Sequence, residues 1–175
     1  MQITDTKERY GFITRLLHWG MALLLLWQFL SAGAHLLLSD TPVEEFFWAT
    51  HKPLGFLLLI LIFIRSLWAL ANLSRRPPSV NRVATLGHVA LYGLIFLIPS
   101  LALLRQYGSG EAFEPLGIAL FSGFEGDEIA WMVLPANLLH SWFGWALLLI
   151  IIGHVFMAFQ HRRQPGHVDV LPRMK

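Results

Sequence analysis

The sequence contains no cysteine, and Lys, Arg, Asp and Glu together make up only 14% of its 175 residues. Without cysteine the chain has no disulfide, no iron–sulfur cluster and no thiolate metal ligand, so any bound metal depends on histidine, methionine or carboxylate. With 55% hydrophobic residues and a mean hydropathy of +0.57, the chain is too apolar for an ordinary soluble domain. These features predict a single integral membrane domain over residues 1–175.

Four apolar stretches are long enough to cross a bilayer as helices, at residues 13–38, 50–71, 83–104 and 138–160. They lack the short alternating pattern of β-barrel strands, so we expect an all-α, four-helix membrane bundle. The first stretch imitates a cleavable signal peptide, but its apolar run is longer than a usual signal, which favours a membrane-spanning helix.

Lysine and arginine are concentrated before the first apolar stretch, between the second and third, and after the fourth, whereas the other two connections are mostly acidic. The positive-inside rule therefore predicts that both termini lie in the cytoplasm. Residues 106–135, which are partly apolar, then lie outside and are expected to form an interfacial segment. The sequence pI is about 9.3, but the basic residues flank apolar segments, so no nucleic-acid partner is expected.

The last apolar stretch carries two histidines, His140 and His154, on one helix face. Fourteen residues make nearly four helical turns and separate the two imidazoles by ~21 Å along the axis. A polar side chain inside a spanning helix needs a partner, and neutral imidazole is a strong ligand for iron, zinc or copper. The alternative is two core histidines hydrogen-bonded to neighbouring helices.

Further histidines lie at the same two depths. His51 lies at the outer depth with His140, and at the inner depth His154 has two candidate partners, His18 and His88. The spacing does not choose between them. Two imidazoles at one depth of a four-helix bundle are what a six-coordinate haem requires.

Three basic side chains and one more histidine lie near these depths. Arg65 follows His51 by fourteen residues, which places it on the same face at the inner depth. A haem propionate would give its charge a partner; the alternative is that Arg65 extends to the inner interface. Lys52 and Arg15 lie beside candidate ligands and are expected to serve other propionates. His35 is left unassigned near the outer interface.

Glycine follows each outer histidine by four residues, at Gly55 and Gly144. A missing side chain one turn from the ligand lets a porphyrin plane approach the backbone. Close helix packing through small residues is the alternative.

Several motifs in order along the chain resemble the bacterial cytochrome b561 family of small, quinone-linked di-haem membrane proteins. They are TRLLHWGMALLL, THKPLGFLLL with Arg65 after it, LGHVALYGLIFLIP, the pair His140 and His154, and the terminal LPRM. The resemblance covers nearly the whole chain. It implies a location in the bacterial inner membrane and two haem b groups per chain.

The resemblance also implies the ligand pairs, His18 with His154 and His51 with His140. His88 also matches a histidine of the family, but the resemblance does not imply that His88 is an iron ligand. The chain departs from the family after the fourth helix, where it reads QHRRQPGH and relatives often carry paired histidines; of these, His161 remains.

Iron held by two histidines has no open position and passes single electrons. The resemblance implies electron transfer between the haems and ubiquinone or menaquinone, with no catalytic residue in the usual sense. We expect the quinone at the inner haem, near His154, with His88 and His161 as proton or carbonyl partners. The alternative for both is hydrogen bonding to helix ends or lipid phosphates.

Other functions remain open at the level of the sequence. One is a di-haem anchor for a separate redox partner protein, as in related subunits of hydrogenases and formate dehydrogenases. A second is superoxide:ubiquinone oxidoreduction, which the acidic outer connections disfavour unless Lys52 and Arg105 form a local positive funnel. A haem-free metal transporter is weakened by the lack of cysteine and of carboxylates within the apolar stretches.

Overall fold

The computed structural model describes residues 2–163 and 169–174, and within these ranges it contains helices and no strand. The long helices are α1 (Phe12–Leu37), α3 (His51–Ala71), α4 (Arg82–Gly108) and α5 (Ala130–Arg163). Four helical segments in the described part are long and apolar enough to span a membrane, with α2 (Pro42–Trp48) continuing into α3 in the second. The predicted all-α fold with four membrane helices is confirmed.

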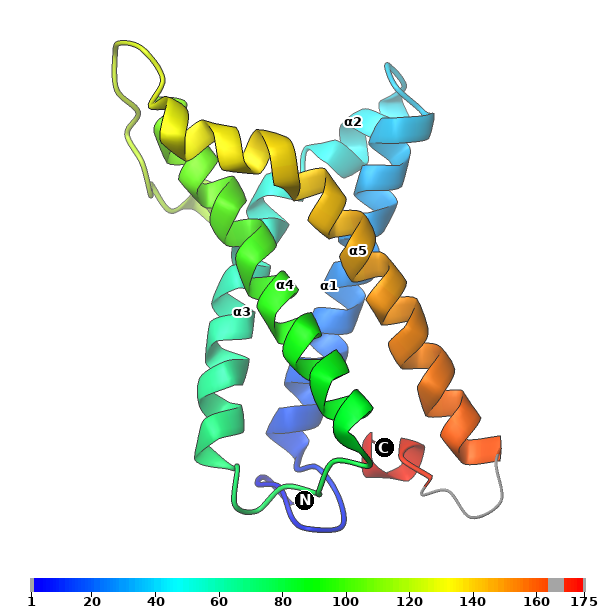
Figure 1. Ribbon diagram of the computed structural model, residues 1–175. Coiled ribbons are helices and arrows are strands. Elements are labelled where there is room, and N and C mark those ends of the chain that lie inside the picture. Colours follow the sequence, from blue (N-terminus) through cyan, green and yellow to red (C-terminus); the bar gives the residue numbers. More distant parts are fainter. Residues whose placement is uncertain (1, 164–168, 175) are drawn as a thin grey trace.

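Both termini lie at one end of the bundle, together with the connection between α3 and α4 (Figure 1). The backbone N–H of Tyr10 donates to the Arg173 carbonyl over 3.1 Å, and Nη1 of Arg173 donates to the Pro78 carbonyl over 3.1 Å. These bonds tie the N-terminal segment, the short helix η2 (Leu171–Met174) and the α3–α4 connection together. This end carries most of the basic residues, so we name it the inner end and the opposite one the outer end.

Helix α4 packs against both α3 and α5, and α1 packs against α3. The buried core lies at mid-depth between the two histidine levels and consists of Met21, Leu58, Ile62, Leu91, Ile95 and Leu147. Many large apolar side chains on the outer faces of the helices are exposed, including Leu23, Phe63 and Leu149. An apolar exterior of this kind suits contact with lipid.

Helix α2 was not predicted from the sequence. Thr41 is its N-cap, with its hydroxyl oxygen accepting from the Glu44 backbone N–H over 3.3 Å, and Pro42 occupies the first helical position. Threonine followed three residues later by glutamate is a capping-box pattern, and proline is favoured at the start of a helix. The helix ends at Trp48, three residues before His51.

Helix α5 begins at Ala130 rather than near residue 138, and α4 continues to Gly108 rather than ending near residue 104. Pro135 lies inside α5, where proline removes one backbone hydrogen bond and favours a bend without ending the helix. The first turns of α5 run across the outer end before the helix descends along α4 (Figure 1). Irregular chain with the short helix η1 (Pro115–Gly117) occupies the rest of the segment predicted to be interfacial.

The N-terminal segment is held at the inner end by one buried carboxylate. Asp5 accepts hydrogen bonds from the Gly11 backbone N–H over 2.9 Å and from the Thr14 hydroxyl over 2.6 Å. The Trp68 indole donates to Thr14 over 2.9 Å, and Arg76 Nε lies 3.6 Å from the carboxylate. A Cβ at Gly11 would lie 2.4 Å from the Ile3 carbonyl oxygen, so only glycine allows this close approach.

Candidate functional site

The outer pair of histidines faces across the bundle from two helices. His51 opens α3 and His140 lies on α5, and their ring centres are 6.3 Å apart with the ring planes 64° from parallel. Both residues are half-buried. The depth match predicted from the sequence is therefore accompanied by close approach of the two rings.

Neighbouring side chains hold the ring of His51. The hydroxyl of Ser31, which is fully buried on α1, lies 2.9 Å from His51 Nδ1. The Trp48 ring stacks on the imidazole with 4.7 Å between centres. In the tautomer in which Nδ1 donates to Ser31, the lone pair of Nε2 is left for a metal. Nδ1 of His140 is also buried but has no hydrogen-bond partner within the described chain.

Three histidines meet at the inner level. The ring centres of His18 on α1 and His154 on α5 are 6.3 Å apart, with the planes 67° from parallel. His88 on α4 lies closer to His154, with 5.4 Å between ring centres. His18 and His154 are half-buried, whereas His88 is exposed on the surface of α4.

Arg65 of α3 lies within this inner group. Both terminal guanidinium nitrogens are 3.2 Å from Nδ1 of His18, and Nε donates to the Tyr92 hydroxyl over 2.9 Å. Among the ion pairs of the described residues, none joins Arg65 to a carboxylate. A part-buried guanidinium without an anion inside a membrane helix is costly, and an anionic group bound here would offset its charge.

The histidine pairs fit an iron porphyrin. Histidine–metal bonds are ~2.0 Å long, and adding roughly 1.1 Å from each nitrogen to its ring centre puts two axial imidazoles about 6 Å apart. The outer and inner pairs both have this separation, at 6.3 Å. Within the described residues no group of three or more His, Asp or Glu side chains is placed to hold a bare metal ion. Two facing ligands suffice when a porphyrin supplies the other four.

Gly55 and Gly144, the two glycines near the outer histidines, differ in the space around them. A Cβ at Gly144 would meet no atom within 4 Å, so the space beside His140 is open. A Cβ at Gly55 would lie 3.2 Å from the side-chain amide of Gln28, which itself donates to the His51 carbonyl over 3.0 Å. Gly144 thus provides open space for a flat ligand, while Gly55 provides room for Gln28.

The remaining predicted residues lie nearer the two surfaces. The Lys52 ammonium is 3.5 Å from Glu111, and both side chains are exposed at the outer end. Arg15 is half-buried in the first turns of α1, and His161 is half-buried in the last turns of α5. Nδ1 of His35 lies 2.8 Å from the Glu44 carboxylate.

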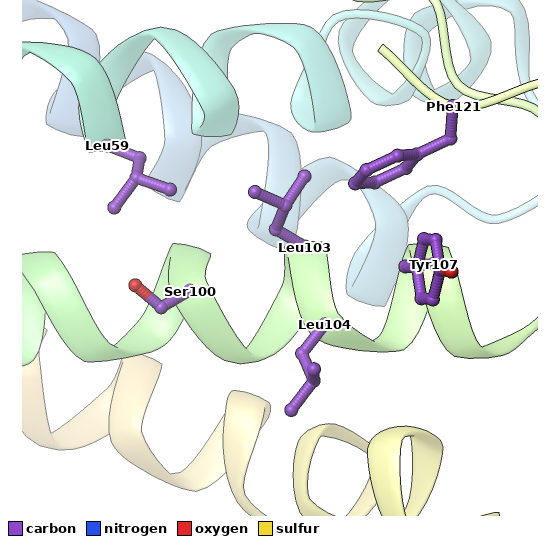
Figure 2. Close-up of a pocket in the computed structure, with 6 residues that line it drawn as sticks. All are labelled: Leu59, Ser100, Leu103, Leu104, Tyr107 and Phe121. Atoms are coloured by element: carbon purple, nitrogen blue, oxygen red, sulfur yellow. The ribbon is translucent and has the colours of Figure 1, made fainter. Parts of the chain in front are cut away.

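Among the described residues, hollows lie at the outer half of the bundle. One, of about 300 Å³, lies between α3 and α4 and is lined by Leu59, Ser100, Leu103, Leu104, Tyr107 and Phe121 (Figure 2). It is almost wholly apolar and includes none of the histidines. The other, of about 520 Å³, lies over the start of α3; its lining includes Trp48, Lys52, Phe113 and Glu114.

Three residues that contact the histidine pairs or Arg65 were not singled out from the sequence: Ser31 and Trp48, which contact His51, and Tyr92, which contacts Arg65. Tyr92 follows His88 by four residues and Trp48 precedes His51 by three, so both spacings carry a local signal of proximity. Ser31 is a polar residue within an apolar helix, and a polar side chain in that environment indicates a hydrogen-bond partner on a neighbouring helix.

Comparison with known proteins identifies the family of the chain. Residues 9–175 match the family model described as prokaryotic cytochrome b561. Cytochrome b561 homolog 2 of Escherichia coli (strain K12) is 28% identical over 180 aligned residues, which cover 92% of this chain and 88% of that protein. The matched region includes all four long helices and every histidine described above.

Proposed function

The chain belongs to the prokaryotic cytochrome b561 family, and on that premise we propose that it holds two haem b groups and passes single electrons between them and a quinone pool. Membership makes it a multi-pass membrane b-type cytochrome of electron transfer. His51 and His140 hold the outer haem in this proposal, and His18 and His154 the inner one. The observation that carries it is the equal 6.3 Å separation of the two pairs.

A haem with histidine on both faces has no open coordination position and exchanges one electron at a time. In this proposal the protein supplies the apolar environment of the two haems and the side chains around them. The apolar core around Leu58, Ile62 and Leu147 separates the two levels and excludes water. In this proposal Nδ1 of His51 donates to the Ser31 hydroxyl, which leaves Nε2 for the iron, and Arg65 offers a positive charge to a propionate at the inner level.

The quinone is ubiquinone or menaquinone and binds at the inner level in this proposal. His88 supports it because its side chain is exposed on α4 while its ring lies 5.4 Å from that of His154. Histidine gives up or takes a proton near neutral pH, as quinone chemistry requires. His161 lies further toward the inner end on α5 and is the second candidate partner.

The protein lies in the bacterial inner membrane with both termini in the cytoplasm. The concentration of arginine at the inner end supports this orientation. Lys52 and Arg15 are the candidates for further propionate contacts, although Lys52 is paired with Glu111 here. That pairing offsets the positive charge at the outer end, which disfavours steering of an anionic donor such as superoxide and favours a neutral donor or a partner protein.

Quinone exchange is tested by stopped-flow reoxidation of the reduced protein with a soluble quinone analogue. His88→Ala and His161→Ala should each slow reoxidation, with both haem spectra intact, whereas the control Val43→Ala, at an exposed position at the outer end, should not. Unchanged reoxidation rates in both inner variants would mean that His88 and His161 only form hydrogen bonds to helix ends or lipid. A wild-type protein that no quinone analogue reoxidises would contradict the quinone-linked function itself.

A further inference from the structure

A continuous stack of rings leads from the outer surface to a candidate iron ligand. Trp48 at the end of α2 stacks on His35 with 3.8 Å between ring centres and 9° between planes, and on His51 with 4.7 Å and 28°. His35 is in turn paired with Glu44 over 2.8 Å. The indole is therefore held between two imidazoles, one exposed and one facing His140.

The stack and the Ser31 hydroxyl constrain His51 in different ways. The bond to Ser31 acts on Nδ1 alone, so it leaves the ring free to turn about that contact. The Trp48 face limits this rotation, because turning the imidazole would break the stacking contact. The plane of an axial ligand and its hydrogen bonds tune the metal to which it is bound.

Trp48 also contacts both His51 and the larger outer hollow. It forms one wall of the outer hollow of about 520 Å³, together with Lys52, Phe113 and Glu114. Trp48 is 39% exposed, and its indole stacks on His51. Removing it would join the hollow to the histidine.

We propose that Trp48 is a positioning residue for the outer haem: it fixes the plane of His51 and keeps water from the iron ligand, with the pair His35–Glu44 holding the indole in place. This inference rests on the proposed ligation by His51. Greater water access favours the more highly charged ferric state. Loss of the indole should therefore lower the midpoint potential of the outer haem and leave the inner one unchanged.

The test uses Trp48→Ala and Trp48→Phe in the full chain, with Val43→Ala as the control, since Val43 is exposed on the same short helix. Each variant is examined by haem count, redox titration and low-temperature EPR, with the outer signal assigned by its absence from His140→Ala. In Trp48→Ala the outer potential should fall and its EPR signal should change. Trp48→Phe should restore part of both, and Val43→Ala should match the wild type.

Loss of the outer haem in Trp48→Ala, with retention in Trp48→Phe and Val43→Ala, would also support the proposal. Wild-type outer potential and EPR signal in Trp48→Ala would overturn it. Equal losses in Trp48→Ala and Val43→Ala would overturn it too, since α2 would then act only by packing. Failure of the proposed function is distinguishable, because the wild-type protein would then contain fewer than two haems.

Discussion

Both terminal nitrogens of the Arg65 guanidinium lie 3.2 Å from Nδ1 of His18. A guanidinium only donates hydrogen bonds, so Nδ1 accepts here and the ring proton of neutral His18 sits on Nε2. Ligation of iron through Nε2 requires the proton on Nδ1 instead. If the proposed inner haem were bound through Nε2, Arg65 would therefore turn from His18, and a propionate would give it the anionic partner that the ion pairs of the described residues do not.

Arg65→Gln is expected to lower the midpoint potential of the inner haem, because removing a positive charge stabilises the ferric state. The shift should be on the order of 50 mV, the effect of one partly screened unit charge. Arg65→Lys keeps the charge and should shift the potential less. Redox titration of the two haems checks this. An inner potential unchanged in Arg65→Gln would show that the guanidinium does not act on the haem.

Ser31→Ala should weaken retention of the outer haem. It leaves the Nδ1–H of His51 without the partner that now lies 2.9 Å away. Removing such a partner of a metal-bound histidine costs roughly 10–100-fold in affinity. Haem transfer to apo-myoglobin measures this, with Ser66→Ala as the control because the Ser66 hydroxyl bonds only to the Ile62 carbonyl of its own helix. Equal transfer rates in both variants would mean that Ser31 does not support ligation.

His18, rather than His88, should ligate the inner haem with His154. The His18 and His154 rings are 6.3 Å apart, as in the outer pair, while His88 is at 5.4 Å and exposed. His18→Ala should abolish the inner low-spin EPR signal, and His88→Ala should keep it. The reverse result would exchange the two assignments.

Asp5→Ala should lower the free energy of unfolding by about 3 kcal/mol, because it removes a buried, charged acceptor of two hydrogen bonds near Arg76. Thermal unfolding in detergent, followed by loss of the haem absorbance, measures the change. Asp40→Asn is the control: Asp40 is exposed with a φ of 61°, a conformation that asparagine also tolerates. A melting temperature equal to that of the control would show that the Asp5 contacts are not stabilising.

Hydropathy and charge were enough to predict the four membrane helices, because apolar length is a property of contiguous residues. The depths of His51, His140, His18 and His154 followed from the rise of a helix. Spacing could not choose between His18 and His88, since the choice depends on how α1 and α4 are rotated toward α5. That rotation is set by packing between helices and not by either helix alone.

The local features missed have different physical origins. Helix α2 had a readable capping signal at Thr41, but it lies outside the long apolar stretches. The apolar stretch predicted a start of the last helix at residue 138, whereas α5 begins at Ala130 and continues through Pro135. The contact between Ser31 and His51 joins residues twenty positions apart on two helices, and no periodicity encodes it.

The number of haems per chain tests the account most directly. Pyridine haemochrome titration against protein concentration should give two haems for the wild type. His51→Ala and His140→Ala should each give one, with the inner low-spin signal retained, and His18→Ala and His154→Ala should each give one, with the outer signal retained. One haem per wild-type chain would contradict this account. Loss of the same haem in a variant of the outer pair and in a variant of the inner pair would contradict the assignment of one haem to each pair.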